Sequence, residues 1–395
     1  MLVAKKKRDR ANFVPNQPRR RLGRRPRHTS AAVDDIGWIA SLSPWPTEGF
    51  GLERMRALLR DLGDPQLRYP AIHVVGTNGK STTARTIEVL LADAGLSVGT
   101  YLSPHVRSWS ERIRVNGAEA DFARAVGRVR AAAEDAHATQ FEALTAAALL
   151  EFAHGEVQVA VVEAGLGGRL DATNVLRSSV VVLTNVALDH MDVLGDTREQ
   201  IAAEKLAVVK PRTAVVLAEP EWRELALENG ADYVVETGRS NLALAVAAAE
   251  TFLERPVEPH AADAVELPGR LERRSEDPLE IWDGAHNLAG LAYLLPRLPS
   301  RSYVLVCSIL ADKRPERMLE ALSALGETLV ATSSSNERAI PAQELAARAE
   351  PYFPHVESVA SPPAALARGR ALAGTEGAVL VTGSLYLLAD LSAAD

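Results

Sequence analysis

The stretch 69–83, YPAIHVVGTNGKSTT, constrains the fold of this chain more than any other. Its apolar run from Ile72 to Val75 has the length of one buried strand, and a glycine-containing turn follows directly. From Thr83 apolar residues recur at helical spacing until Gly95, where a helix would end. This order of strand, turn and helix predicts a phosphate cradle, because backbone N–H groups and the helix N-terminus point at the anion.

The turn also predicts which residues contact a nucleotide. Lys80 adds a positive charge for the terminal phosphates, and a hydroxyl group behind it can bind Mg²⁺. The loop has the short form G-x-x-G-K-S, because Val74 stands where the general P-loop pattern has its first glycine. The alternative is an incidental lysine at a strand-to-helix turn, but the flanking elements favour nucleotide binding. The predicted contacts are Gly76, Thr77, Asn78, Gly79, Lys80, Ser81 and Thr82.

The charge of the chain is unevenly distributed. The 395 residues carry a net charge of −7, but residues 1–28 hold eleven basic residues and one acid, which leaves 33 basic and 50 acidic residues, a net −17, in the remainder. An acidic body argues against nucleic acid as a ligand. The basic tail, residues 1–30, lacks an apolar pattern, so we expect it to be disordered and not a secretory signal. Contact of this tail with nucleic acid and a misassigned start codon remain alternatives to a solvated tail.

Composition limits the class of protein and the cellular compartment that fit this chain. The hydrophobic content of 47% suits globular packing in two or three domains. No apolar run approaches the roughly 20 residues that a membrane crossing needs. The single cysteine, Cys307, lies in an apolar run, which fits a structural role in a reduced compartment. We therefore expect a cytoplasmic protein without a membrane partner, and we take it to be a monomer.

The order of elements predicts two α/β domains in series. Apolar runs alternate with helical stretches, as in parallel sheets, and a proline-containing segment, 256–268, is the best linker candidate. We expect a mostly parallel P-loop-type sheet domain at 31–262 and a smaller Rossmann-like α/β domain at 263–395. The expected strands beyond the first are 97–102, 157–163, 179–184, 213–218, 231–235, 280–282, 303–309, 328–332, 355–359 and 378–382. Residues 121–152 are alanine-rich and expected to be helical.

Polar residues follow several of these strands, at the edge where α/β sheets bind ligands. Glu163 ends an apolar run, and a buried acid needs a partner such as Mg²⁺ bound to phosphate. His190 also follows a strand, but a lone histidine is often structural, and Asp189, Asp192 and Glu163 compete as ligands. Lys205 lies in a helix that begins with a capping box, and taken alone it is a solvated surface charge.

Two residues of the second domain are further candidates for the ligand-binding site. Arg270 could clamp a phosphate, and Asp283, at a strand end before a glycine, could hold a ribose or orient a base. A surface arginine and a turn aspartate are the plain alternatives. None of these local patterns defines a reaction.

A series of motifs along residues 51–390 resembles the folylpolyglutamate synthase/dihydrofolate synthase family, part of the Mur-ligase-like ATP-dependent amide ligases. The motifs are GTNGK at 76–80, SPH at 103–105, ERI at 111–113, FEALT at 141–145, EAGLGGRLDATN at 163–174, TN at 184–185, DH at 189–190, LG at 194–195, EK at 204–205, PGRLE at 268–272, DGAHN at 283–287, DK at 312–313 and TGSLY at 382–386.

The resemblance implies an ATP-binding domain of the Mur-ligase central type followed by a glutamate ligase domain. Lys80 and its loop would bind the ATP phosphates, Arg270 and Asp283 would reach ATP from the second domain, and His286 would lie near the reacting centre. Two Mg²⁺ ions are implied, with the family's metal positions matched by Ser103, Glu163 and His190.

The resemblance also changes the interpretation of Lys205. It matches a lysine that is carbamylated in the family and supports the second Mg²⁺. Positions beside the pterin substrate are matched by Ser103, Pro104, Arg112 and Phe141.

The chain departs from the family in three places. The family has glycine after the lysine of the loop, and here Ser81 follows Lys80 while Thr82 aligns with the family's serine, so either hydroxyl could meet Mg²⁺. Leu288 replaces the proline after the DGAHN motif, and Trp109 stands where the family commonly has phenylalanine.

The reaction implied is ATP-dependent activation of a folate-type carboxylate as an acyl phosphate, which the amino group of L-glutamate then attacks. Sequence does not separate dihydropteroate from reduced folate (tetrahydrofolate) as acceptor. A second Mur-type ligase acting on a cell-wall precursor is the nearest alternative, and the PGRLE and SLY motifs favour folate. A non-catalytic nucleotide-binding regulator is the other, and it would not need the full set of Lys80, Glu163, His190, Lys205, Arg270 and Asp283.

Overall fold

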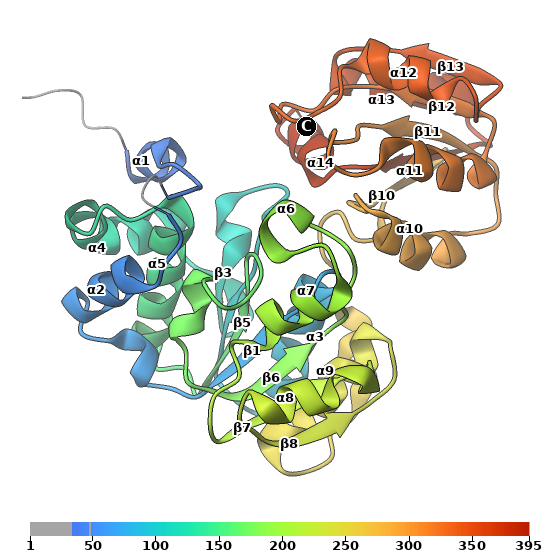
Figure 1. Cartoon of the computed structure of the whole chain (residues 1–395). Helices are drawn as coiled ribbons and strands as arrows, with labels where there is room; N and C mark the ends of the chain where they lie inside the picture. The colour runs from blue at the N-terminus through green and yellow to red at the C-terminus, as the bar shows by residue number, and fades with distance from the viewer. Residues whose placement is uncertain (1–33, 47–48, 395) are drawn as a thin grey trace, which may run out of the picture.

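The computed structural model describes residues 34–46 and 49–394, so the predicted basic tail lies outside the described residues. Two α/β domains follow one another, each built on its own sheet (Figure 1). The fold class predicted from the sequence is thereby confirmed, and the exact domain boundaries stay a prediction.

The first domain is built on an eight-stranded sheet with the order β4-β3-β2-β5-β1-β6-β7-β8. The six strands from β2 to β8 in this order pair in parallel, and the hairpin β3–β4 is antiparallel. The central strand β1 carries the phosphate-loop sequence at its carboxyl end. The strands are β1 Ala71–Val75, β2 Val98–Tyr101, β3 Ile113–Val115, β4 Ala118–Glu119, β5 Val159–Glu163, β6 Ser178–Leu183, β7 Thr213–Leu217 and β8 Ala231–Glu236.

Helices cover both faces of this sheet because its strands are apolar on both sides. One face packs on α3 and α9, the other on α5, α4 and the short helices α1 and α2, and α7 and α8 cover the end with β6 and β7. The helices are α1 Asp35–Ser41, α2 Glu53–Asp61, α3 Lys80–Asp93, α4 Phe122–Asp135, α5 Gln140–His154, α6 Met191–Leu194, α7 Arg198–Leu206, α8 Arg223–Glu228 and α9 Asn241–Leu253.

The second domain is a six-stranded sheet with the order β13-β12-β11-β14-β10-β9. Its strands are β9 Glu272–Glu276, β10 Leu279–Trp282, β11 Tyr303–Cys307, β12 Thr328–Ala331, β13 His355–Ser358 and β14 Ala378–Thr382. Helices α10 Leu288–Leu294, α11 Pro315–Leu322 and α12 Ala342–Ala349 pack on one face, and α13 Pro362–Ala373 and α14 Leu385–Ser392 on the other. Cys307 is a buried free thiol in β11, as its apolar surroundings predict.

Strands β3, β4 and β9 were not among the predicted strands. Strand β9, Glu272–Glu276, has the sequence ERRSE and pairs antiparallel at the sheet edge, where one face meets water and charged side chains are tolerated. The alanine-rich region 121–152 is helical, as predicted, and is divided into α4 and α5 because Thr139 forms a capping box with Glu142 that starts α5.

The linker joins the domains through a short 3-10 helix. This element, η5 Pro259–Ala264, lies against α3 and α9. The other 3-10 helices are η1 Pro65–Leu67, η2 Trp109–Arg112, η3 Ala172–Val175, η4 Pro220–Trp222, η6 Leu295–Arg297 and η7 Ser323–Leu325.

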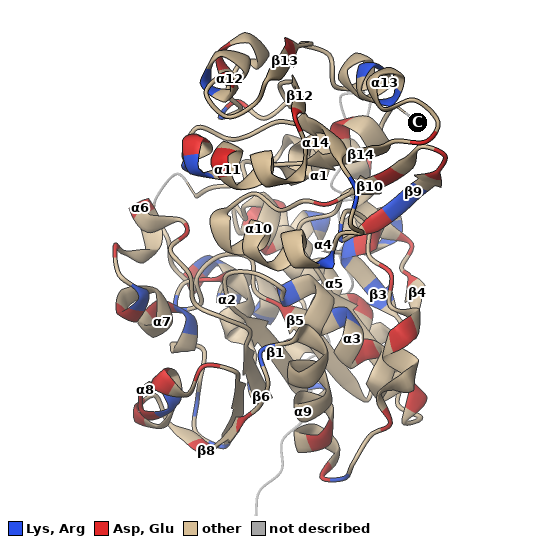
Figure 2. Ribbon diagram, turned by 90° about the vertical axis from the view of Figure 1, so that its right-hand side faces the viewer, with Lys and Arg blue, Asp and Glu red and all other residues tan. Residues whose placement is uncertain are grey.

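Lys and Arg alternate with Asp and Glu over both domains (Figure 2). Across residues 34–46 and 49–394, no helix combines the length and apolar character that crossing a membrane requires.

Candidate active site

The phosphate loop follows β1 and is held in shape by the end of the neighbouring strand β6. The backbone N–H of Thr77 donates to the carbonyl of Asn185 at 3.0 Å, and that of Asn78 donates to the Asn185 side chain at 3.1 Å. The Thr184 hydroxyl donates to the carbonyl of Asn78 at 2.7 Å. A Cβ at Gly76 would collide with the Thr184 side chain, so glycine is required for this close approach. The loop is therefore preformed, and α3 begins at Lys80, three residues earlier than the sequence pattern predicts.

Two side chains at the start of α3 face the interior of the site. Lys80 Nζ donates to the carbonyl of Thr77 at 3.3 Å, which holds the amine over the loop. The Ser81 hydroxyl donates to Glu163 Oε1 at 3.0 Å. Of the two hydroxyls that the sequence leaves open, Ser81 is the one hydrogen-bonded to the carboxylate, although Thr82 also lines the cavity.

Glu163 ends β5 and is only 1% exposed. Its second oxygen accepts the backbone N–H of Ser103 at 2.9 Å. Burial raises the pKa of Glu163 above its ordinary value, and the positive charge of Lys80 acts in the opposite direction. A buried carboxylate held by one hydroxyl and one amide is well suited to a cationic ligand.

Lys205 lies in α7 and is buried, with only 3% exposure, so the surface-charge interpretation is wrong for this residue. Its Nζ donates to the carbonyl of Gly76 at 2.8 Å, at the first residue of the phosphate loop. Burial, with the charge of Lys80 as a smaller cause, lowers the pKa of Lys205 from 10.5 to about 7. A large fraction of this amine is therefore neutral near neutral pH.

The second domain contributes a loop that follows β10. Asp283 accepts the backbone N–H of Leu271 at 2.8 Å and that of Ala285 at 2.9 Å. Because Leu271 follows Arg270, these bonds hold the turn that contains Arg270 beside the loop that follows β10. Burial raises the pKa of Asp283, and the charge of Arg270 opposes that effect. Arg270 Nη1 donates to the carbonyl of Gly269 at 3.0 Å and reaches the same cavity as the phosphate loop.

His286 follows in the same loop. Its Nδ1 lies 2.9 Å from the carbonyl of Gly284, and because a carbonyl only accepts, Nδ1 carries the proton. Burial lowers the pKa of His286 from 6.5 to about 4, so the ring is neutral and Nε2 is an acceptor.

Asp189 takes part in a buried contact between the two domains. Its carboxylate accepts Lys313 Nζ at 2.5 Å and Asn287 Nδ2 at 2.8 Å, both from the second domain. The same amide of Asn287 also donates to Asn78 of the phosphate loop at 3.2 Å. Burial alone would raise the pKa of Asp189, but the hydrogen bond and charge of Lys313 hold it well below its ordinary value. This contact ties the position of the second domain to the phosphate loop.

His190 lies directly after Asp189, in a left-handed conformation at the start of α6. Burial lowers the pKa of His190, with Asp189 opposing, so the imidazole is neutral and can act as a metal ligand. Asp192, a competing candidate in the sequence, is exposed and does not line the cavity.

These groups face one cavity of about 550 Å³ between the domains. Most residues predicted from the sequence line it, namely Gly76, Thr77, Asn78, Gly79, Lys80, Ser81, Thr82, Ser103, Pro104, Glu163, His190, Lys205, Arg270, Asp283 and His286. Those of the first domain lie at the carboxyl-terminal edge of its sheet, as expected for an α/β fold, and Arg270, Asp283 and His286 reach the cavity from the second domain.

The two remaining predicted residues, Arg112 and Phe141, lie behind the cavity wall. Arg112 is buried, donates to His105 Nδ1 at 2.8 Å and stacks over Trp109 with 5.0 Å between its guanidinium carbon and the ring centroid. Phe141 lies against Gly165, a cavity residue, and its ring centroid is 6.0 Å from that of Tyr101. They support the wall in this structure.

Within the described ranges, no group of three or more His, Cys, Asp or Glu side chains is placed to hold a metal ion. Among the residues matched to the family's metal positions, Glu163 offers a carboxylate, His190 a neutral imidazole and Ser103 a hydroxyl to the cavity. This set fits Mg²⁺, which keeps several waters and shares phosphate oxygens rather than filling its coordination shell from protein.

The sequence analysis missed the interdomain role of Asp189, Lys313 and Asn287. Asp189 and Lys313 were visible only as parts of the DH and DK motifs, and no local pattern connects them. Each partner of Asp189 lies about a hundred positions away, at separations of 124 and 98 residues.

Comparison with known families matches both halves of the chain. Residues 74–261 match the Mur ligase middle domain, and residues 269–385 match the Mur ligase, glutamate ligase domain. The dihydrofolate synthase/folylpolyglutamate synthase of Escherichia coli is 32% identical, over 93% of this chain and 96% of that protein. The chain belongs to this family. It is accordingly an ATP-dependent ligase.

A further relative and two solved structures support the same family assignment. The Bacillus subtilis dihydrofolate synthase/folylpolyglutamate synthase is 31% identical, over 86% of this chain and 94% of its own. The structure of E. coli FolC with DHPP and ADP matches with a TM-score of 0.83 at 30% identity, over 92% of this chain and 98% of that one. The Yersinia pestis bifunctional enzyme with AMPPNP and Mn matches with a TM-score of 0.81 at 30% identity, over 94% and 99%.

Proposed function

We propose that this ligase adds L-glutamate both to dihydropteroate and to tetrahydrofolate and its glutamylated forms. The observation that carries the proposal is an interdomain cavity that brings Lys80, Glu163 and Lys205 of one domain together with Arg270 of the other. The bifunctional names of the E. coli and B. subtilis relatives support both acceptors.

The phosphate loop and two cations hold the ATP phosphates in this proposal. Loop amides and the start of α3 face the anion, Lys80 neutralises charge on the transferred phosphoryl group, and Arg270 adds a second cation from the other domain. Asp283 acts through Arg270, because its hydrogen bonds fix the turn on which that arginine stands. The substrate carboxylate attacks the γ-phosphate, and the amine of glutamate then displaces phosphate from the acyl phosphate.

Mg²⁺ would be held by Glu163, His190 and the hydroxyls of Ser81 and Ser103. Its contribution when bound is to neutralise charge on the phosphate oxygens. The raised pKa of Glu163 supports this, because a cation beside the carboxylate removes the cost of keeping it ionised while buried. The Mn complex of the Y. pestis relative supports a divalent metal in this family.

Lys205 is proposed to carry a carbamate. Its neutral amine adds to CO₂, releases one proton and becomes an anion with two oxygens. Burial beside Gly76 and the lowered pKa supply the neutral amine that the addition needs. The modified side chain would support a second Mg²⁺ with oxygen ligands.

The pterin end of the acceptor is proposed to lie by Ser103 and Pro104, with Arg112 and Phe141 supporting that wall. His286, neutral and with Nε2 free to accept, is placed near the reacting carboxylate. A cytoplasmic location, a monomeric state and the domain limits at 30 and 262 stay predictions from the sequence.

The test is incorporation of labelled L-glutamate, with ATP and Mg²⁺, into dihydropteroate and into tetrahydrofolate in separate reactions. We expect both acceptors to be labelled, with one ADP formed per glutamate. Labelling of only one would restrict the function to that acceptor, and labelling of neither would refute the proposal.

A further inference from the structure

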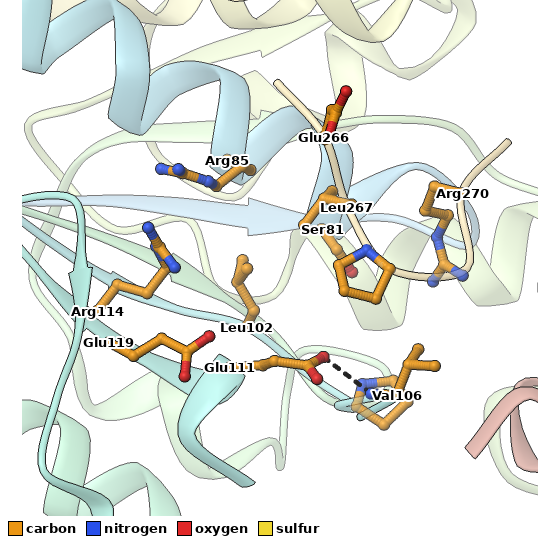
Figure 3. Close-up of a pocket in the computed structure, with 12 residues that line it drawn as sticks. Ser81, Arg85, Leu102, Val106, Glu111, Arg114, Glu119, Glu266, Leu267 and Arg270 are labelled. Atoms are coloured by element: carbon orange, nitrogen blue, oxygen red, sulfur yellow. Dashed lines mark hydrogen bonds between the residues drawn. The ribbon is translucent and has the colours of Figure 1, made fainter. Parts of the chain in front are cut away.

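A second hollow of about 110 Å³ opens beside the catalytic cavity (Figure 3). Three residues, Ser81, Pro104 and Arg270, line both spaces, so the two adjoin at the place where the phosphate loop and the second domain meet. The hollow extends from there between α3, the β3–β4 hairpin and the linker. Its other lining residues are Arg85, Leu102, Val106, Glu111, Arg114, Glu119, Glu266, Leu267 and Pro268.

Two arginines lie together at the far end of the hollow, opposite Arg270 (Figure 3). Arg85 extends from α3 and Arg114 from β3, and both are paired with one buried carboxylate. Glu88 Oε2 lies 2.7 Å from Arg85 Nη1, and Glu88 Oε1 lies 3.4 Å from Arg114 Nε. Because Glu88 is 1% exposed and supplies one negative charge to two guanidinium groups, this end of the hollow keeps one positive charge in excess.

The acids of the hollow do not cancel this excess at its inner end. Glu111 accepts the backbone N–H groups of Val106, Arg107 and Ser108, so its oxygens are already engaged in shaping the loop. Glu119 stands opposite Arg114 in the β3–β4 pair and Glu266 lies in the linker; both are exposed, so water screens their charges. Between the two cationic ends, beside Glu111, the wall has apolar side chains from Leu102, Pro104, Val106, Leu267 and Pro268. The hollow therefore fits a short flexible chain with methylene groups and a carboxylate.

Chain growth creates a ligand of this kind. Each glutamate within a polyglutamate chain uses its amine and one carboxyl group in amide bonds, so one carboxylate per residue stays free. The reacting carboxylate must return to the same phosphate loop in every cycle, so residues added earlier need space that adjoins it. The hollow adjoins that point at Ser81 and Arg270.

We propose that Arg85 and Arg114 form a subsite for the free carboxylate of a glutamate residue already attached to the acceptor. The inference rests on the proposed function and adds a specificity element to it. Arginine forks match carboxylate geometry, and Glu88 keeps both guanidinium groups in place. The subsite acts on acceptors that carry a glutamate tail and leaves dihydropteroate, which has none, unaffected.

The test compares acceptors of different tail length with the variants Arg85→Gln and Arg114→Gln. We expect KM for tetrahydrofolate triglutamate to rise at least tenfold in either variant. KM for dihydropteroate and KM for L-glutamate should stay within twofold of wild type. The matched control is Arg348→Gln, which removes an exposed arginine paired with Glu316 and Glu344 in the second domain and should change none of these values.

Loss of an arginine beside Glu88 could unfold the protein, so a different variant tests the subsite without removing either arginine. Glu119→Lys replaces an exposed acid by a cation, and we expect it to lower KM for the triglutamate at least twofold without changing KM for dihydropteroate. An unchanged triglutamate KM in folded arginine variants, or in Glu119→Lys, would overturn the proposal. A rise in KM for L-glutamate with dihydropteroate as acceptor would also overturn it, because the carboxylate bound there would be that of the incoming amino acid. Failure of the proposed function gives a different result, since wild type would then label no acceptor.

Discussion

Replacing Lys205 by alanine tests the role of a residue that local sequence pattern alone would assign to the surface. The amine is buried, donates to the carbonyl of Gly76, and has its pKa lowered to about 7. At pH 7.4 such an amine is roughly 70% neutral, whereas an ordinary lysine with a pKa near 10.4 is roughly 0.1% neutral. Because only the neutral amine adds to CO₂, burial gives Lys205 far more of the reactive form than a surface lysine has.

We expect Lys205→Ala to lower kcat by at least a hundredfold and acetate to restore part of it, because acetate can supply the missing carboxylate oxygens. In wild type, activity at fixed CO₂ should fall as pH decreases through about 7, since protonation of Lys205 removes the neutral amine. The acetate-rescued variant should lack that acidic limb, because acetate stays ionised well below pH 7. The assay is initial rate against pH, with and without acetate, alongside a ¹³C spectrum in labelled bicarbonate that should lose one carbamate signal in the variant.

Lys210 provides the matched control. It is partly buried, its pKa is lowered to about 8, and it donates to the carbonyl of Asn174 at 2.8 Å, away from the cavity. Lys210→Ala should leave the carbamate signal in place and gain nothing from acetate. Normal turnover by Lys205→Ala, or a wild-type spectrum without that signal, would refute the reasoning.

Three further predictions concern other parts of the molecule. Lys80→Ala should lower kcat by several orders of magnitude while circular dichroism and Tm stay near wild type. Acetate should not rescue this variant because the missing group is an ammonium. Near-normal turnover would contradict the phosphate-loop role of Lys80. Asp189→Asn removes the buried partner of Lys313 and leaves only the partly exposed Asp312, 3.3 Å away, as its counter-charge. Loss of a buried partner destabilises a protein, so we expect at least a hundredfold loss in kcat/KM for ATP and a lower Tm. Asp192→Asn, at an exposed position nearby, is the control, and equal behaviour of the two variants would exclude an interdomain role. Deleting residues 1–28 should leave the rate of glutamate addition unchanged, and a large loss would place the tail at the active site.

The phosphate-binding region was predictable because its signals are local. An apolar run, a glycine turn and an amphipathic stretch stand next to one another in the sequence, and the structure places a strand, a loop and a helix there. Lys80 and Glu163 follow from the rule that ligands bind at the carboxyl ends of parallel strands. Lys205 did not follow from local pattern, because a lysine in a capped helix has the same sequence appearance whether the helix faces water or the phosphate loop.

Contacts between distant segments could not be predicted in this way. Asp189 binds Lys313 and Asn287 across the domain boundary, and nothing in the neighbourhood of any of the three specifies the other two. The pairing of Arg85 and Arg114 on Glu88 likewise depends on a hairpin returning beside α3. Strand β9 could not be predicted because its side chains are mostly charged. An edge position tolerates such side chains, but that position is set by the rest of the sheet.

The central claim is that the interdomain cavity activates a carboxylate by phosphorylation before glutamate attacks, and isotope transfer tests it most directly. Dihydropteroate labelled with ¹⁸O in both carboxylate oxygens is incubated with the enzyme, ATP, Mg²⁺ and L-glutamate, and the released phosphate is analysed by mass. An acyl phosphate requires that one carboxylate oxygen leave with the phosphate, so we predict one ¹⁸O in each phosphate and the other in the product amide. Phosphate free of ¹⁸O would show that ATP is cleaved without phosphorylating the carboxylate, and the account would be contradicted.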